Sequence, residues 1–270
     1  MSILRTDQIE ARYENHTVFK DLNISIAEGR ITTIIGPNGC GKSTLLKTIG
    51  RILKQTGGQV FLQEENLNTI PTREIARRLS LLPQNPAAPG ELTVEELIAY
   101  GRYPHRKNIN KLTGRDQEMI EWAMELTKTA AFRSRSIGTL SGGQKQKVWL
   151  AMALAQHTKV LLLDEPTTYL DMAHQLDVLQ IVETLNRDYE CSVVMVLHDI
   201  NHAARFSHEM VAMKEGEIIA SGEPADIMKE GVLRDVFDIQ ARVMMDPQNG
   251  APVCYGYESL FEQEKQHAHR

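Results

Sequence analysis

This sequence lacks any long apolar stretch, and it shows no internal repeat or low-complexity segment. Its longest strongly apolar segments, residues 160–163 and 193–197, are only long enough for buried strands, whereas a membrane-spanning helix needs about 20 apolar residues. The first 16 residues are polar and contain no apolar core of a secretory signal. We therefore expect a chain that does not cross a membrane by itself and that would reach one only by docking on another protein.

The sequence also contains few cysteines and no excess of positively charged residues. The three cysteines, Cys40, Cys191 and Cys254, are far apart and form no CxxC pair, which fits a reducing compartment better than a disulfide framework. The chain has 30 Lys and Arg against 35 Asp and Glu, a formal net charge of −5. This balance predicts no broad basic surface, so nucleic acid is not expected as a partner.

Short apolar segments alternate with helical patterns along most of the chain. Such alternation predicts an α/β fold with a mixed, mostly parallel sheet that helices cover on both faces. We expect strands at residues 21–26, 31–35, 59–62, 79–82, 159–163, 192–197 and 210–214. We expect helices between them at residues 43–53, 73–78, 172–188 and 199–206.

The middle of the chain departs from this alternation. Helical patterns at residues 93–100, 114–131 and 142–156 predict a helical subdomain over residues 86–157. It would be inserted into a core formed by residues 2–85 and 158–240, with a C-terminal extension over 241–270. Short helices are expected at 224–237, and turn sequences at Glu215-Gly216 and Asn249-Gly250 predict hairpins.

A glycine-rich segment, GPNGCGKST, lies between an expected strand and an expected helix. It fits the pattern GxxxxGK[ST], in which backbone N–H groups and a helix N-terminus face phosphate oxygens. Lys42 would neutralise phosphate charge, and Ser43 would ligate Mg²⁺. A chance match is expected in about 1% of chains of this length, and the strand–loop–helix setting makes it rarer. We therefore predict that a nucleotide is bound by Gly36, Pro37, Asn38, Gly39, Cys40, Gly41, Lys42, Ser43 and Thr44.

Cys40 lies among the N–H groups of this loop. Thiols at helix N-termini tend to have lowered pKa values. We therefore expect a lowered pKa for Cys40, alkylation there that blocks nucleotide binding, and protection by the nucleotide.

Two acidic residues follow the apolar segment 160–163. In a parallel sheet the carboxyl ends of the strands face the ligand, so Asp164 would hold Mg²⁺ through water. Glu165 would polarise the attacking water as a general base. In isolation this pair would more simply be an acidic loop. The phosphate-binding pattern in the same chain favours the catalytic interpretation.

A second glycine turn precedes the expected helix at 142–156. Ser141 and Gln144 fit a capping box, which explains these two residues but not Gly142 and Gly143, because glycine weakens the first turn of a helix. Glycine lets another group approach the backbone closely, and a helix N-terminus attracts anions. This turn therefore predicts a second phosphate-binding helix start.

His198 and His202 form an H-x-x-x-H pattern that superficially resembles a zinc protease helix. Asp199 stands where such a helix has glutamate, and no third ligand is evident. The metalloprotease interpretation is therefore disfavoured, and a surface histidine pair is the simplest alternative. Because His198 follows the strand next in sequence after the acidic one, we expect it to donate a hydrogen bond to the γ-phosphate.

Residues 140–144, LSGGQ, resemble the signature motif of ABC-type ATPases, and the resemblance extends over residues 4–221. It implies a P-loop NTPase (RecA-like) core with an inserted helical subdomain. Tyr13 resembles the aromatic residue that stacks on adenine. Gln84 resembles the Q-loop glutamine, which senses the γ-phosphate and contacts the permease. Residues 168–171, TYLD, which end at Asp171, resemble the D-loop, and His198 resembles the switch histidine.

The same resemblance implies cofactors, partners and a location. In this family the signature turn acts across a head-to-tail dimer, so two ATP molecules would lie between protomers of a homodimer or of a pair with a homologous subunit. Transmembrane permease subunits would be direct partners, contacted through Gln84 and the loop to residue 91, and a substrate-binding protein an indirect one. The chain would be peripheral, on the cytoplasmic face of the bacterial plasma membrane. ATP and Mg²⁺ would be the cofactors, with Ser43, Gln84 and Asp164 around the metal.

Three further segments narrow the resemblance: YGRYPHR at 100–106, PTTYLDMAHQ at 166–175 and HDINHAARF at 198–206. They resemble ATPases of bacterial iron–siderophore, haem and cobalamin importers, the siderophore group most of all. This implies an ATP-hydrolysing importer subunit whose cargo is a chelated metal, first of all an iron(III)–siderophore. The alternatives are a haem or cobalamin importer, a soluble ABC protein acting on nucleic acid or ribosomes, and a nucleotide-binding regulator without hydrolysis. A single cassette disfavours the soluble class, and Glu165 with His198 disfavours the regulator.

Overall fold

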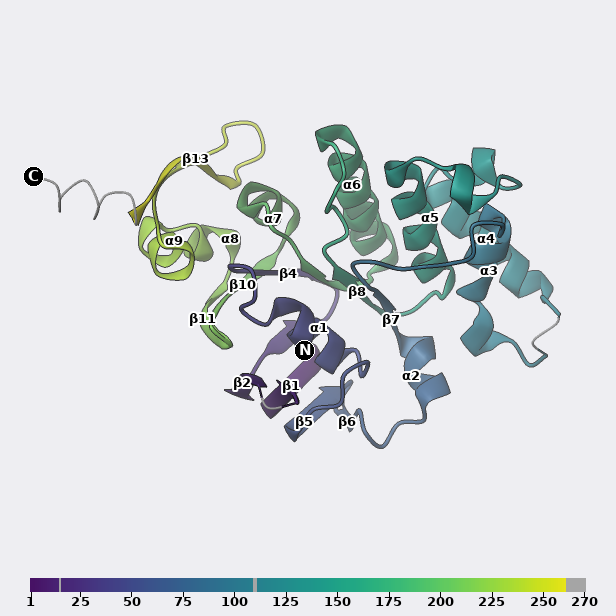
Figure 1. Ribbon diagram of the computed structural model, residues 1–270, viewed down its shortest axis with the longest axis horizontal. Coiled ribbons are helices and arrows are strands. Elements are labelled where there is room, and N and C mark those ends of the chain that lie inside the picture. The colour runs from purple at the N-terminus through teal and green to yellow at the C-terminus, as the bar shows by residue number, and fades with distance from the viewer. Residues whose placement is uncertain (15, 109–110, 261–270) are drawn as a thin grey trace, which may run out of the picture. The chain divides into compact units, whose positions relative to one another are not determined.

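The computed structural model describes residues 1–14, 16–108 and 111–260 (Figure 1). It divides into two compact units. The first unit contains Met1–Glu64 and Val194–Arg270, and the second Glu65–Val193. This division differs from the one predicted from the sequence, which stays a prediction, and residues 261–270 of the predicted extension lie outside the described residues. In the described ranges, no helix combines the length and the apolar character that a membrane crossing needs.

The first unit contains parallel and antiparallel strands. β4 (Ile31–Ile35) is completely buried and runs parallel to β10 (Glu209–Lys214). β10 also pairs antiparallel with β11 (Glu217–Gly222) through a turn at Glu215 and Gly216, which both have positive φ as a tight hairpin requires. Helices α1 (Lys42–Ile49) and α7 (Ile200–Phe206) also belong to this unit. The α/β class, the mixed sheet and the first predicted hairpin are confirmed.

A second sheet of the first unit is antiparallel. Its long strand β1 (Ser2–Tyr13) pairs with β2 (His16–Leu22), β3 (Ser25–Ala27) and β5 (Gly57–Leu62). The sequence pattern did not predict β1. The reason is that register shifts interrupt its pairing with all three neighbours, and Gln8 has a φ of 46°, so apolar and polar residues do not alternate regularly.

The end of the described chain forms the second predicted hairpin, from β12 (Ile239–Met245) and β13 (Pro252–Ser259). It follows α8 (Pro224–Ile227) and α9 (Glu230–Phe237), and the strands are drawn in the yellow of the C-terminal region (Figure 1). The side-chain amide of Asn201, in α7, forms hydrogen bonds to β13 through both its nitrogen and its oxygen. Its Nδ2 donates to the Cys254 carbonyl at 3.0 Å, and its Oδ1 accepts from the Cys254 N–H at 2.8 Å. The hairpin is therefore tied to the helix that follows His198.

The second unit combines buried strands with helices. β7 (Leu79–Leu82) pairs in parallel with β8 (Val160–Asp164). β6 (Glu65–Asn66) is short, and β9 (Ser192–Val196) lies at the boundary between the units. The helices are α2 (Thr72–Arg78), α3 (Val94–Tyr100), α4 (Gly114–Leu126), α5 (Gly142–Ala155) and α6 (Met172–Tyr189). The helix predicted at 114–131 ends early because Lys128 adopts a φ of 57°, which a continuing helix does not allow.

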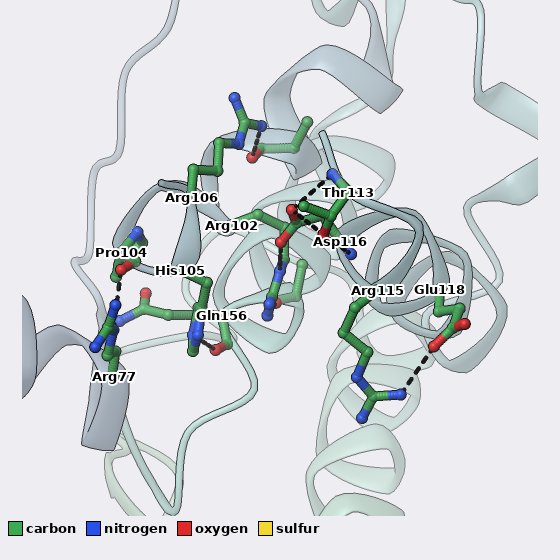
Figure 2. A network of polar contacts seen from close by, with 12 residues as sticks. Arg77, Arg102, Pro104, His105, Arg106, Thr113, Arg115, Asp116, Glu118 and Gln156 are labelled. Carbon is green, nitrogen blue, oxygen red and sulfur yellow. Dashed lines mark hydrogen bonds and ion pairs between the residues drawn. The ribbon is translucent and has the colours of Figure 1, made fainter. Parts of the chain in front are cut away.

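A polar network inside the second unit holds residues 100–106 against α4 and α5 (Figure 2). Arg102 Nε donates to Asp116 Oδ1 at 2.9 Å, and the two side chains are only 5% and 4% exposed. Arg102 also donates to the Ala155 carbonyl at 2.8 Å, near the C-terminus of α5. Burial opposes ionisation of Asp116, but hydrogen bonds from Thr113 and Arg102 outweigh it, so its pKa lies below the usual value. Asp116 is therefore a carboxylate, and the network is a buried ion pair.

Candidate functional site

The glycine-rich loop of the first unit leads from β4 into α1. Gly36, Gly39 and Gly41 all have positive φ, at 148°, 78° and 105°. At Gly36 an added Cβ would lie 2.1 Å from the Met213 carbonyl oxygen, so no other residue fits there. Gly41 is the N-cap of α1, and as a glycine it brings no side chain to cap the helix. The first N–H groups of α1 are therefore not satisfied by their own cap residue, which is the arrangement that binds anions.

Lys42 is folded into this loop. Its ammonium nitrogen donates to the carbonyls of Gly36 and Pro37, both at 2.8 Å, and the residue is 5% exposed. Thr44 is also buried, and Ser43 is half-buried. The loop thus holds one positive charge inside a ring of backbone groups, where it can exchange carbonyl oxygens for phosphate oxygens.

Cys40 differs from expectation. It is 4% exposed, and burial raises the pKa of its thiol, while Lys42 and backbone N–H groups lower it only in part. The predicted lowering of this pKa is therefore wrong, because the loss of hydration outweighs the nearby positive charge.

Tyr13 and His198 belong to the same unit. Tyr13 ends β1, opposite His16, and its side chain is exposed. His198 is exposed and lines a hollow with Asp199, Asn201 and Tyr257. Asp199 caps α7 by accepting from the N–H groups of Asn201 and His202 at 2.8 and 2.9 Å. The Asp of the H-x-x-x-H pattern is therefore a helix cap.

In the second unit the structure brings Gln84 and Glu165 together. Gln84 Nε2 donates to Glu165 Oε2 at 2.5 Å, and Thr168 Oγ1 donates to the same oxygen at 3.0 Å. Glu165 has a φ of 52°, and the N–H of Thr168 donates to its carbonyl at 3.3 Å, so the chain turns back on the carboxylate. Left-handed φ values cost about 1–2 kcal/mol in non-glycine residues, and such strain concentrates at functional sites. Sequence reasoning placed Thr168 in the D-loop but did not foresee its bond to Glu165, although a hydroxyl three residues after Glu165 in the same turn was the available signal.

The signature turn opens α5 as the capping box that the sequence predicts. Ser141 Oγ accepts from the Gln144 N–H at 3.3 Å, and Gln144 Oε1 accepts from the Ser141 N–H at 3.1 Å. The two glycines differ. A Cβ at Gly142 would meet nothing within 4 Å, whereas a Cβ at Gly143 would lie 2.4 Å from Cδ2 of His174.

Asp171 is the N-cap of α6. Its Oδ1 accepts from the backbone N–H of His174 at 2.9 Å and lies 2.7 Å from His174 Nδ1. These two bonds, the backbone one first, lower the pKa of Asp171. Sequence reasoning missed His174, because only the folded chain places its ring against Gly143.

The residues predicted around Mg²⁺ offer oxygen ligands: a hydroxyl from Ser43, an amide carbonyl from Gln84 and a carboxylate from Asp164. Asp164 ends β8 and is 1% exposed. In the part of the chain that the structure describes, no three or more His, Cys, Asp or Glu residues gather into a metal cage. This donor set fits a hard cation that keeps water and phosphate ligands, as Mg²⁺ does.

The comparisons with known proteins agree with one another. Residues 19–168 match the family model described as ABC transporter. The chain is 48% identical to the iron(3+)-hydroxamate import ATP-binding protein FhuC of Bacillus subtilis (strain 168), over 98% of both proteins. It is 42% identical to the ferric enterobactin transport ATP-binding protein FepC of Escherichia coli (strain K12), over 93% of this chain and 92% of that protein. The dimeric structure of a bacterial ABC transporter cassette, MJ0796, is 28% identical, with a TM-score of 0.72, and the match covers 82% of this chain and 98% of that one.

Proposed function

The chain belongs to the ABC transporter ATPase family, and we propose that it is the ATP-hydrolysing subunit of an importer for an iron(III)–siderophore complex. One observation carries the cargo class: the similarity to FhuC and FepC runs along nearly the whole chain, well beyond the shared ATPase motifs. Iron(3+)-hydroxamate and ferric enterobactin, the cargoes in the names of these two relatives, are both within this proposal. Haem and cobalamin are the competing cargoes.

In the proposed site, the phosphate loop binds ATP. Lys42 neutralises charge on the phosphates, the backbone from Gly36 to Thr44 surrounds them, and Tyr13 stacks on adenine. Ser43, Gln84 and Asp164 would hold Mg²⁺, which would supply positive charge against the phosphates. The support is the left-handed glycine loop with its inward Lys42, and the oxygen ligands of the metal set.

Hydrolysis needs a base and a group that senses the γ-phosphate. Glu165 accepts a proton from the attacking water, and His198 donates a hydrogen bond to the γ-phosphate. Gln84 connects the base to the proposed metal site, since its amide nitrogen is bonded to Glu165 while its carbonyl oxygen is the atom suited to the metal. Gln84 would therefore couple the binding of metal and nucleotide to the position of the Glu165 carboxylate.

ABC transporter ATPase subunits dimerise and pair with transmembrane permeases. For this chain we propose a homodimer in which Ser141, Gly142, Gly143, Gln144 and Asp171 complete the nucleotide site of the other protomer. Gln84 and the loop to residue 91 contact the permease, and a substrate-binding protein delivers the cargo from the far side. The location would be the cytoplasmic face of the bacterial plasma membrane.

Two experiments test this proposal. Glu165→Gln should bind ATP, trap a dimer and lose most hydrolysis, and unchanged turnover would remove Glu165 as the base. Deletion of the gene should abolish growth on an iron(III)–siderophore as the sole iron source, and a plasmid copy should restore it. Retained growth on every siderophore, with loss of haem or cobalamin use, would overturn the cargo.

A further inference from the structure

The signature turn contains two neighbouring glycines whose surroundings differ. The space above Gly142 is open, since an added Cβ would touch nothing within 4 Å. The space above Gly143 is filled by the ring of His174, whose Cδ2, Cγ and Nε2 would lie 2.4, 2.8 and 2.9 Å from such a Cβ. A neighbour within the same unit, His174, therefore excludes a side chain at Gly143.

The ring of His174 has a second contact on its other side. Its Nδ1 lies 2.7 Å from Asp171 Oδ1, and the same carboxylate oxygen accepts from the His174 backbone N–H. The ring is thus fixed at one edge by the cap of α6, while its other edge rests on the first turn of α5. One turn farther along both helices, Lys147 forms an ion pair with Asp177 at 2.5 Å. The start of α5 and the start of α6 are joined at two points.

We propose that His174 is a positioning residue that sets the spacing between the signature turn and the D-loop, so that residues 141–144 and Asp171 meet the nucleotide as one surface. The inference rests on the proposed function, in which both segments act on the ATP of a second protomer. An imidazole suits this task, because it is a rigid plane that keeps its Nδ1 edge on Asp171 and its Cδ2 edge on the bare backbone at Gly143. His174 itself need not touch the nucleotide.

Helix propensity and the steric argument make opposite predictions for Gly143. Replacing a glycine in a helix with alanine ordinarily stabilises the helix. Gly142→Ala should follow this rule in the isolated chain. Gly143→Ala should not, because its methyl group would overlap the His174 ring.

The experiment is a double-mutant cycle between Gly143→Ala and His174→Ala in the full chain, with Gly142→Ala as the control. Thermal unfolding reports the packing, and the KM and kcat for ATP, together with ATP-driven dimerisation in a Glu165→Gln background, report the positioning. We expect Gly143→Ala alone to raise the KM for ATP about tenfold, and His174→Ala in the same chain to restore at least about a threefold part of this loss. Gly142→Ala should show no such rescue.

A conservative variant separates positioning from simple packing. His174→Asn keeps an N–H donor near Asp171 but removes the outer part of the ring. It should relieve Gly143→Ala as well as His174→Ala does, and by itself it should keep the KM closer to that of the unsubstituted chain. A merely structural role would change the melting temperature without this ordering of KM values.

The outcomes are distinguishable. If Gly143→Ala raises the KM and removal of the ring does not restore it, Gly143 serves the nucleotide directly and the proposal is overturned. Coupling in thermal unfolding alone, without coupling in KM or dimerisation, also overturns it, since His174 would then only pack. If the unsubstituted chain with its permease hydrolyses no ATP, the proposed function fails, and with it this inference.

Discussion

The phosphate loop and the signature turn are both glycine-rich helix starts, but they are built in opposite ways. α1 begins at Gly41 without a side-chain cap, and Lys42 turns back into the loop, where it is 5% exposed. α5 begins with a complete capping box, and Ser141 and Gly142 are exposed. The first start gathers its polar groups inward around one charge. The second bonds the N–H groups of Ser141 and Gln144 within its own capping box and presents its surface outward.

In the proposed dimer, this difference would let each chain contribute one part to each of two nucleotide sites. The phosphate loop has the charge and the bare N–H groups that a triphosphate needs. The signature turn is already capped by its own side chains, so a ligand that it binds must come from outside the turn. The dimeric arrangement proposed above supplies such a ligand from the other protomer.

The largest effect should come from the buried Arg102–Asp116 ion pair. Arg102→Ala leaves Asp116 buried and unpaired, so we expect a loss of about 3–5 kcal/mol in the free energy of unfolding. Urea denaturation of the variant checks this. Arg115→Ala is the matched control, because the Arg115–Glu118 pair in Figure 2 is 64% exposed on both sides, and such pairs contribute about 0–1 kcal/mol. Equal losses in the two variants would contradict the buried ion pair.

The next effect should separate the two helix starts directly. Lys42→Met should weaken ATP binding by the isolated chain about a hundredfold or more, because it removes the charge inside the loop. Ser141→Ala should leave that binding nearly unchanged and lower turnover in the dimer. Equilibrium binding of a fluorescent ATP analogue and steady-state hydrolysis measure the two quantities. If Ser141→Ala weakened binding by the isolated chain as much as Lys42→Met, the proposed division of labour would be wrong.

A smaller effect concerns the cap itself. Ser141→Ala removes the acceptor for the Gln144 N–H, so the free energy of unfolding should fall by about 1 kcal/mol. Ser141→Asp keeps an acceptor and should retain most of this stability. Chemical denaturation of both variants measures the difference, and an unaffected alanine variant would show that the cap contributes little.

The smallest effect is on the reactivity of Cys40. The thiolate is the reactive form, and burial raises the pKa of Cys40. Alkylation of the native chain should therefore be slow at neutral pH and should accelerate only above the pH at which an exposed thiol ionises. Mass spectrometry of iodoacetamide-treated protein over a pH series, with the unfolded chain as the reference, measures this. A native rate at neutral pH equal to that of the unfolded chain would contradict a buried thiol.

Local sequence patterns predicted the features that depend on neighbouring residues. The phosphate loop, the Ser141–Gln144 capping box and both hairpins follow from short patterns, because turn and cap chemistry act over a few residues. The bond of Thr168 to Glu165 and the contact of His174 with Gly143 were not foreseen. Both contacts depend on which side chain the fold places beside these residues, and Gly143 is separated from His174 by the rest of α5, by β8 and by the turns that follow each of them.

Burial was the other property that the sequence patterns did not predict. The position of Cys40 at a helix start predicted a lowered pKa, and only the folded chain shows that desolvation prevails. Likewise the segment at 100–106 resembled a family motif without revealing why. Arg102 within it is the buried partner of Asp116, and a single sequence contains no signal that pairs them.

The two hydrogen bonds between Asn201 and Cys254 also depend on the order in which the chain is synthesised. A ribosome adds about 5–20 residues per second, beginning at the N-terminus, and 53 residues separate the two partners. α7 is therefore synthesised before the strand that holds it. A chain released before residue 254 would carry its phosphate loop and its signature turn, but the helix after His198 would lack both of these hydrogen bonds.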